Sequence, residues 1–545
     1  MEACRINVSG AKEKWRDRLK VVFRVDASLQ MGTGHVMRCL TLAHVLKENS
    51  ANIEFICRKH EGSLIDKIRS SGFVVHELGM PEEIKVDTRL VHSHWLGATQ
   101  QQDTDDCIDI VKSVKTDWLI VDHYALDELW QKRLKPYCEK LMVIDDLADR
   151  KHQCDILLDQ TFGRQQEDYL AHTPEDCKLL LGSQYALLRP EFAEWRAYSL
   201  ERRSKPEFKQ LLINMGGVDV DNVTEKALDE LKICNLPNDI KITVVMGEAA
   251  PYLESVKFKA ITLPYKTEVK VDVDNMAEIM ANSDIAIGAA GATTWERCCL
   301  GLPTIQIVVA ENQLFSAETL AYHNIVKLAK EIKETTYLLE SSSEWMKSIG
   351  SSALKICDGM GSYKVFNKMA DYKVILQKFG EIDLCNYVNL DEHDNMLTLN
   401  MRNHSQVKKW MYNQDSISKT EHFNFIKSLE NDIDRRYFLI KQKGTIIGAV
   451  NFANITSNKP AIFGFYANPF EQILGAGRML ELTSLHFIFR ELNLSKITLE
   501  VFSDNKQVVN LHKKFGFEIV SEKNKNGKKV FCMELSQRAG NESSY

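Results

Sequence analysis

A histidine follows a glycine-rich turn near the start of the chain, in the segment Gly32-Thr-Gly34-His35. An apolar run precedes the turn, and a segment that predicts a helix follows it. Glycines let the backbone adopt positive φ and approach a ligand closely, and the first N–H groups of a helix attract a negative group. Histidine takes a proton from water at neutral pH. The segment therefore predicts an anion site with a base beside it; a histidine that only caps a helix is the alternative.

Two later loops have the same strand-to-helix character. Gly216 and Gly217 form a second turn with N–H groups able to cradle a phosphate. The segment from Ala289 to Glu296 also follows an apolar run, and Glu296 lies about one helical turn inside the next element. A carboxylate there could accept two hydrogen bonds from a ribose diol. Each glycine turn alone is weak evidence, because tight turns need glycine for packing, but together the loops predict a nucleotide site.

A fourth glycine turn lies far downstream, in Gln472-Ile-Leu-Gly475-Ala-Gly477-Arg478. It follows a strand-like run and opens a long segment of helical periodicity. Successive N–H groups at such a helix start could wrap a pyrophosphate, and the helix dipole would reinforce them.

Composition limits the classes of protein to consider. At 545 residues, the chain predicts three or four units. It is 44% hydrophobic and 26% charged, with a net charge of −6 and no dense basic block, so we expect no nucleic-acid partner. Thirteen cysteines without a Cys-x-x-Cys pair indicate a reducing cytoplasm rather than disulfides or a zinc module. No run approaches the roughly 18 apolar residues of a membrane span, and we expect no membrane partner.

Apolar strand-like runs alternate with helical patterns through two successive series, as in parallel sheets covered by helices on both faces. The first series comprises Val21 to Val25, Ile53 to Cys57, Phe73 to His76, Trp118 to Val121, Leu141 to Ile144 and Ile156 to Leu158. The second comprises Gln210 to Met215, Lys241 to Met246, Ile261 to Leu263, Ile285 to Gly288 and Thr304 to Val308. Two facing halves of this kind place ligands in the cleft at the carboxyl ends of their strands.

A mixed α+β unit follows, with a helix from about Gly477 to Glu491 between its third and fourth strands. Its expected strands are Tyr437 to Lys441, Thr445 to Phe452, Ile462 to Tyr466, Lys496 to Val501 and Lys529 to Glu534. The expected domains are an N-terminal extension (1–20), a Rossmann-like domain with the histidine (21–200), a second Rossmann-like domain (201–370), a linker (371–384) and the α+β unit (385–540).

Residues 21 to 370 resemble a family of two-domain hydrolases with a glycosyltransferase-B-like fold. These enzymes remove UDP from UDP-2,4-diacetamido-2,4,6-trideoxy-β-L-altropyranose in pseudaminic acid synthesis. The matching motifs are Arg24-x-Asp26, Gly32-x-Gly34-His35-x-Met37-Arg38-Cys39, Val121-Asp122-His123-Tyr124, Ile144-Asp145-Asp146-Leu147-Ala148, Asp155-x-Leu-Leu-Asp159-Gln160, Gly216-Gly217-x-Asp219 and the block from Gly288 to Gln313. The second-half loops are also similar to those that hold UDP in the lipid-II-forming N-acetylglucosaminyltransferase.

The resemblance implies that His35 is the essential catalytic group, either as a general base or as the group that orders the attacking water. Direct attack at C1 would invert the anomeric configuration. The expected residues for UDP and its sugar are Asp26, Gly32, Gly34, Arg38, Tyr124, Gly216, Gly217, Gly291, Thr293, Thr294, Glu296 and Asn312. Asp219-Val-Asp221 and Asp272-Val-Asp274 look like metal-binding pairs, but backbone amides already supply the diphosphate contacts, so we expect no essential metal.

Residues 385 to 535 resemble the GNAT acetyltransferases, and more narrowly those that acetylate the 4-amino group of UDP-4-amino-4,6-dideoxy-N-acetyl-β-L-altrosamine. The narrower match lies in Arg402-Asn403-His404, Val407-x-Lys409-Trp410-Met411-Tyr412, Glu421-His422 and Phe463-Gly464-x-Tyr466. The resemblance implies acetyl-CoA as co-substrate, and the residues expected to bind it are Gln472, Gly475, Gly477, Arg478 and Asn505. His512 stands where the family usually has a tyrosine acid, and an imidazolium could donate the same proton.

Together the resemblances imply consecutive steps of one pathway, N-acetylation of a UDP-amino-sugar and then hydrolytic loss of UDP. Two alternatives remain open. One is a UDP-sugar-dependent glycosyltransferase with an accessory acetyltransferase, and the other is a nucleotide-sugar-binding regulator with inactive sites. UDP release without any acceptor would distinguish a hydrolase from the glycosyltransferase. A His35 variant that leaves UDP release unchanged would favour the regulator.

Overall fold

The computed structural model describes residues 19–81, 89–456 and 459–537, apart from the side chain of Asn312. The expected N-terminal extension lies almost wholly outside these residues. The chain divides into two compact units, residues 20–365 and a unit that begins at Phe366. No helix within the described ranges is long and apolar enough to cross a membrane.

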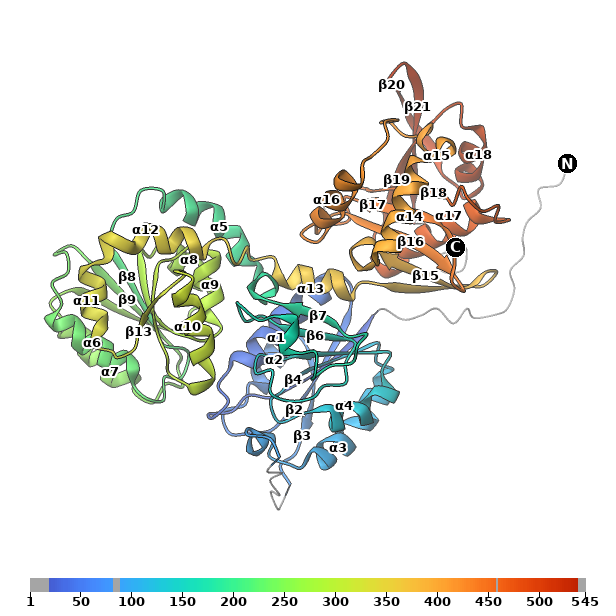
Figure 1. Cartoon of the computed structure of the whole chain (residues 1–545). Coiled ribbons are helices and arrows are strands. Elements are labelled where there is room, and N and C mark those ends of the chain that lie inside the picture. The colour runs from blue at the N-terminus through green and yellow to red at the C-terminus, as the bar shows by residue number, and fades with distance from the viewer. Residues whose placement is uncertain (1–18, 82–88, 457–458, 538–545) are drawn as a thin grey trace. The chain divides into compact units, whose positions relative to one another are not determined.

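The first half of unit 20–365 is a seven-stranded parallel sheet with strand order β3-β2-β1-β4-β5-β6-β7 (Figure 1). The strands are β1 (Lys20–Val25), β2 (Asn52–Arg58), β3 (Val74–Leu78), β4 (Trp118–Asp122), β5 (Lys140–Ile144), β6 (Ile156–Asp159) and β7 (Lys178–Leu181). The helices are α1 (Gly34–Glu48), α2 (Ile65–Ser70), α3 (Gln100–Val114) and α4 (Glu128–Leu134). The six strands predicted in this half are confirmed.

The second half is a six-stranded parallel sheet with strand order β10-β9-β8-β11-β12-β13. Its strands are β8 (Gln210–Asn214), β9 (Lys241–Met246), β10 (Lys266–Val271), β11 (Ile285–Ala289), β12 (Thr304–Ile307) and β13 (Lys327–Ala329). Its helices are α5 (Pro190–Arg202), α6 (Val223–Ile233), α7 (Leu253–Ile261), α8 (Met276–Ala281), α9 (Thr293–Cys299), α10 (Leu314–Tyr322), α11 (Glu334–Glu340) and α12 (Ser342–Ala353), and α13 (Gly361–Met369) follows them.

Alternating strand residues of β8 show why the second sheet is covered on both faces. Leu211 and Ile213 belong to a core with α6, α7, α11 and α12, whereas Leu212 belongs to a core with α5, α8, α9 and α10. Figure 1 shows these two helix groups on opposite sides of the sheet. The apolar runs are therefore buried from both sides, as parallel strands are.

The strand expected at 261–263 is wrong. Ile261 ends helix α7 with its side chain 76% exposed, and the strand lies at β10 instead. β10 is an edge strand of alternating polar residues, Lys266-Thr-Glu-Val-Lys-Val271, so its apolar signal is weak.

The second unit contains one mixed eight-stranded sheet with order β14-β15-β16-β17-β18-β19-β21-β20. Its strands are β14 (Tyr372–Leu376), β15 (Gly380–Asn386), β16 (Arg436–Gln442), β17 (Thr445–Ala453), β18 (Ala461–Ala467), β19 (Lys496–Phe502), β20 (Glu518–Lys525) and β21 (Lys528–Ser536). Its helices are α14 (Glu392–Asn403), α15 (Ser405–Lys408), α16 (Lys419–Leu429), α17 (Ala476–His486), which continues as a π-helical turn (Phe487–Glu491), and α18 (Lys506–Lys514).

The linker expected at 371–384 is corrected to a β-hairpin of this sheet. β14 pairs antiparallel with β15, and Val374, Ile382 and Leu384 are fully buried in the core of the unit. In β15, Ile382 lies between Glu381 and Asp383, so the apolar pattern of that strand is weak. β14, by contrast, has the apolar run Tyr372-Lys-Val-Ile-Leu376, which the sequence analysis did not interpret as a strand. The pair of Rossmann-like sheets and the mixed sheet agree with the predicted fold class.

Candidate active sites

His35 lies in the first turn of α1, directly after the glycine turn that follows β1. Its Nδ1 lies 2.6 Å from Oδ1 of Asp122, at the end of the adjacent strand β4. Only 9% of His35 is exposed, and its ring packs edge-on against Tyr124. Because a carboxylate accepts, Nδ1 carries the proton, and Nε2 is left for a ligand. No described residue is a hydrogen-bond partner of Nε2.

Asp122 is held by more than the histidine. The guanidinium of Arg38, one helical turn after His35, donates from Nε to Oδ2 at 2.6 Å and from Nη2 to Oδ1 at 2.7 Å. Burial opposes ionisation of Asp122, but the charge of Arg38 and the hydrogen bonds from Arg38 and His35 outweigh it and hold its pKa well below the usual range. The sequence analysis includes Asp122 in a matching motif but assigns it no role; in the structure Asp122 fixes the orientation of the imidazole.

A second carboxylate extends this network towards the cavity. Arg38 donates from Nη1 to Asp146 at 2.9 Å, and the hydroxyl of Tyr124 donates to the other oxygen of the same carboxylate. Burial, followed by the charge of Asp146, raises the pKa of Tyr124 well above its ordinary value, so the phenol stays protonated. Asp146 is therefore a further residue of the cavity, which the sequence analysis names in a motif but to which it assigns no role.

A cavity of about 480 Å³ lies beside His35 and is lined by both Rossmann-like halves of unit 20–365. From the first half come Met31, Gly34, His35, Arg38, Tyr124, Asp146, Leu147, Gln160, Thr161 and Arg164, and from the second come Ala290, Gly291, Ala292, Trp295, Glu311, Gln313, Phe315 and Ser316. The structure therefore brings together five of the expected residues: Gly34, His35, Arg38, Tyr124 and Gly291.

The strand orders explain why these loops converge. In each sheet the order reverses direction at one point, between β1 and β4 in the first and between β8 and β11 in the second. Ligands bind at the carboxyl ends of strands at such a point. Gly32 and Gly216, after β1 and β8, have φ of 73° and 99°, and a Cβ on Gly217 would lie 3.9 Å from the hydroxyl oxygen of Thr33. The two glycine turns thus lie close together.

Other expected residues do not line this cavity. Asp26 is 1% exposed and accepts from Arg24 and from the main-chain N–H of Arg58, in a buried charge network. Thr293 and Thr294 accept from the buried guanidinium of Arg297. The side chain of Asn312 lies outside the described residues.

Glu296 is in the first turn of α9, as expected, but it is not among the residues that line the cavity of His35. Burial raises its pKa to about 7, although the charges of Arg189 and Arg297 partly offset the effect. A carboxylate that is only partly solvated is stabilised by additional hydrogen-bond donors, and a ribose diol has two.

The second unit has its own cavity, of about 770 Å³, where two strands separate. β18 and β19 pair in parallel only at Ala461 with Ile497 and at Ile462 with Thr498. Beyond these residues both strands line the cavity, at Phe463–Asn468 and Leu499–Phe502. The split leaves strand edges that face the cavity instead of each other.

The fourth glycine turn borders this cavity at the start of α17. Gly475 has a φ of 82°, and a Cβ on Gly477 would lie 3.2 Å from Leu511 of α18. Both positions therefore favour glycine, one for its backbone and one for close helix packing. Gly475, Gly477, Arg478 and Asn505 line the cavity as expected, whereas Gln472 does not.

His512 also lines this cavity, and its partner is a residue that the sequence analysis missed. Its Nδ1 lies 3.0 Å from Oε1 and 2.9 Å from Oε2 of Glu481, which is fully buried on α17. Phe463, Phe465 and Phe517 surround the ring edge-on.

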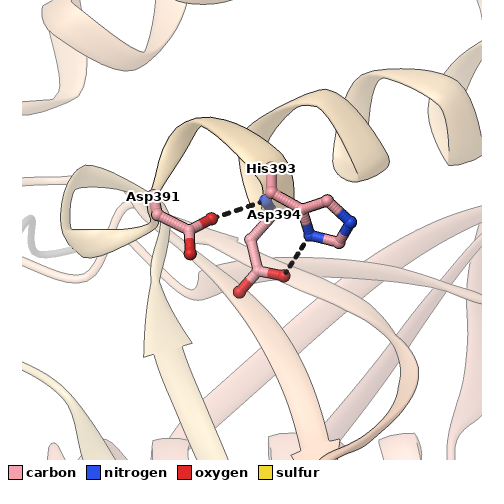
Figure 2. A group of neighbouring side chains, drawn as sticks. All are labelled: Asp391, His393 and Asp394. Atoms are coloured by element: carbon pink, nitrogen blue, oxygen red, sulfur yellow. Dashed lines mark hydrogen bonds and ion pairs between the residues drawn. The ribbon is translucent and has the colours of Figure 1, made fainter.

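Asp391, His393 and Asp394 form a cluster with metal-ligating atoms close together (Figure 2). Asp391 caps α14 by accepting from the N–H of Asp394 at 2.7 Å, and Asp394 forms an ion pair with Lys441 at 2.5 Å. His393 has 86% of its side chain exposed. Helix capping and ion pairing account for this arrangement without a metal.

Comparison with known proteins assigns both units to classes. Residues 401–517 match the acetyltransferase (GNAT) family, and residues 211–353 match the glycosyltransferase family 28 C-terminal domain. Acetyltransferase PseH of Campylobacter jejuni is 33% identical over 26% of this chain and 87% of its own length. Its crystal structure with acetyl coenzyme A covers 29% of this chain and 99% of that one, at 27% identity and a TM-score of 0.24.

The unit from 20 to 365 has relatives of its own. The UDP-2,4-diacetamido-2,4,6-trideoxy-β-L-altropyranose hydrolase of Campylobacter jejuni is 28% identical over 56% of this chain and 96% of that protein. An uncharacterized protein of Methanocaldococcus jannaschii is 26% identical over 82% of this chain and 85% of its own length, a span that includes parts of both units.

The second unit, with its split sheet and glycine turn, belongs to the acetyltransferase class. Through this unit the chain belongs to the GNAT acetyltransferase family. The first unit is a glycosyltransferase-B-like pair of Rossmann-like domains, related at modest identity to a UDP-sugar hydrolase.

Proposed function

We propose that the chain is a bifunctional nucleotide-sugar enzyme of pseudaminic acid synthesis. The second unit transfers an acetyl group from acetyl-CoA to the 4-amino group of a UDP-amino-sugar. The first unit then hydrolyses the resulting UDP-2,4-diacetamido-2,4,6-trideoxy-hexose to the free sugar and UDP. The observation that carries the hydrolase assignment is the Asp122-oriented imidazole of His35 beside a cavity lined by both Rossmann-like halves.

In the hydrolytic step, water attacks C1 from the face opposite UDP. The new C1–O bond forms as the bond from C1 to the diphosphate oxygen breaks, and the configuration at C1 inverts. Nε2 of His35 accepts the proton of the water, while Asp122 holds the Nδ1–H. The glycine turns at Gly216 and Gly291 provide N–H groups for the leaving diphosphate, and Glu296 holds the ribose.

In the acetylation step, the free amine attacks the thioester carbonyl carbon and the C–S bond breaks. The amine must be deprotonated to attack, and the departing thiolate gains a proton. His512 lines the cavity and is the group we assign to that second transfer. The helix start at Gly475 to Arg478 faces the same cavity and suits the pyrophosphate of acetyl-CoA.

The experiment is mass spectrometry of the products formed by the full chain from the 4-amino UDP-sugar and acetyl-CoA. We expect the free diacetamido sugar and UDP from the wild type. His35→Ala should accumulate the UDP-linked diacetamido sugar instead. Equal UDP release by the wild type and His35→Ala would refute the role of His35.

The match of residues 211–353 to a glycosyltransferase domain supports a second candidate, a UDP-sugar-dependent glycosyltransferase with an accessory acetyltransferase. The same reaction distinguishes them, because a transferase requires an acceptor other than water. UDP release that depends on an added acceptor would favour this candidate.

A further inference from the structure

Glu481 is the one charged partner of His512 among the described residues that contact the ring. The carboxylate lies on α17, is 0% exposed, and has no other hydrogen-bond partner in the described parts of the chain. A buried carboxylate without a counter-charge or hydrogen bonds is strongly disfavoured. Glu481 therefore depends on the imidazole of His512 for its compensation.

The surroundings of the ring leave one nitrogen for chemistry. Phe463 and Phe465 of β18 and Phe517 pack edge-on against it and bring no charge. Nδ1 is engaged by Glu481, so Nε2 is the nitrogen available in a residue that lines the cavity.

The other charged groups of the same cavity are Arg478 on α17, Lys514 on α18 and Glu500 on β19. Glu500 is already paired with Lys523 at 2.5 Å. None of these side chains makes a hydrogen bond or ion pair with His512 in the described structure, whereas Glu481 lies within 3.0 Å.

We propose that Glu481 is a positioning residue that holds Nδ1 of His512 and directs Nε2 towards the thioester, so that Nε2–H protonates the departing thiolate of CoA. This inference rests on the proposed acetyltransferase activity. The proton balance is complete. Nε2–H passes to the CoA sulfur as the C–S bond breaks, the ring becomes neutral with Nδ1–H still bound to Glu481, and a proton released by the amine reprotonates it.

The pair also bears on how a histidine serves where the family usually has a tyrosine. With Nδ1 held by the carboxylate, Nε2 is the ring nitrogen left to donate a proton to the sulfur, as a tyrosine hydroxyl would.

The test compares Glu481→Gln with the wild type in the full chain. The amide oxygen still accepts from Nδ1, but the negative charge is lost. We expect the alkaline limb of kcat to move to lower pH by about 1–3 units, because an opposite charge at this distance shifts a titration by that much. The KM for acetyl-CoA should stay within about twofold. An alkaline limb that does not move would overturn the proposal, even if Tm falls.

Two further variants separate positioning from a purely structural role. Glu491→Gln is the matched control, since Glu491 belongs to another buried histidine pair of the same helical segment, with His486 at 3.4 Å; it should leave the limb in place. In a His512→Tyr background, adding Glu481→Gln should not shift the pH profile. A shift there as large as in the wild-type background would contradict the proposal.

A readout without the sugar keeps this inference separate from the proposed function. NMR of ¹³C/¹⁵N-histidine-labelled full chain, with the His512 signal assigned by its loss in His512→Tyr, follows the ring titration directly. Glu481→Gln should move its midpoint to lower pH, and Glu491→Gln should not. If that shift occurs while no amino-sugar is acetylated, the proposed substrate is refuted and the proposed role of Glu481 is supported. If acetylation occurs without the shift, the proposed role of Glu481 is refuted.

Discussion

Asp122→Asn is the perturbation that most directly probes how the first unit orients its histidine. The carboxylate receives Nδ1–H of His35 at 2.6 Å and two donors of Arg38, and all three groups are buried. An asparagine presents one NH₂ group that cannot accept, so either His35 or Arg38 loses its partner. Nδ1 facing an amide N–H favours the tautomer with the proton on Nε2, which cannot take a proton from water.

The expected size of the effect follows from these contacts. A correctly oriented general base raises the reaction rate by ~10²–10⁴-fold, so kcat for UDP release should fall by the same factor. The stability loss should be about 3–5 kcal/mol, because Arg38 remains buried with only Asp146 as a charged partner. KM should change less than kcat, since the site's glycine turns are untouched.

A matched control separates lost stability from lost orientation. Asp145 is also fully buried, at the end of β5, and pairs with Arg150 at 2.9 Å without contacting His35. Asp145→Asn should destabilise the protein comparably yet retain most of kcat. The assay is steady-state UDP release with thermal unfolding of each variant by circular dichroism. A folded Asp122→Asn variant with kcat within about threefold of the wild type would refute the reasoning.

Three further predictions follow from other parts of the structure. The pKa of Glu296 is raised to about 7, so ionisation of this group in the folded protein lowers the free energy of unfolding as pH rises from about 4.5 to 7. Glu296→Gln should therefore raise the free energy of unfolding at pH 8 by about 1–3 kcal/mol and leave it unchanged near pH 4, as measured by urea unfolding. The same substitution should weaken UDP binding, as measured by calorimetry. Greater stability without weaker UDP binding would remove Glu296 from the site. Gly477→Ala places a methyl group 3.2 Å from Leu511, and should weaken acetyl-CoA binding by about tenfold in isothermal titration; unchanged affinity would contradict the assigned role of this turn. His35→Ala should keep the wild-type rate of acetylation, because His35 and His512 lie in different units. For the same reason, His512→Ala should keep the wild-type rate of UDP release from the diacetamido substrate. Loss of both activities in either variant would contradict independent sites.

Glycine turns and buried parallel strands were predictable because their signals are local. The Gly32–His35 turn and the Gly475–Gly477 turn depend on a short sequence stretch, and both lie at the edge of a cavity. The strand β15 was missed because its buried residues alternate with charged ones, whereas β14 has an apolar run that the sequence analysis assigned to a linker. β10 was misplaced for the same reason, as an edge strand with polar residues.

The partners of the two histidines were not predictable from local pattern. Asp122 lies 87 residues from His35, and Glu481 lies 31 residues from His512, so only strand order and helix packing bring them together. Asp26 shows a second limit of local pattern. An aspartate at a strand end looks like a ligand residue, but the side chain here turns into a buried charge network with Arg24. The periodicity of apolar residues in the sequence does not show which way the side chain at the end of a strand points.

The most direct test of the hydrolase assignment is the position of the new oxygen when the full-length wild type turns over the UDP-diacetamido sugar in H₂¹⁸O. Attack at C1 by water predicts one ¹⁸O in the released sugar, none in UDP, and an inverted anomer in the first NMR spectra. Appearance of ¹⁸O in UDP would mean that water attacks phosphorus, and would contradict a site in which His35 readies water for C1.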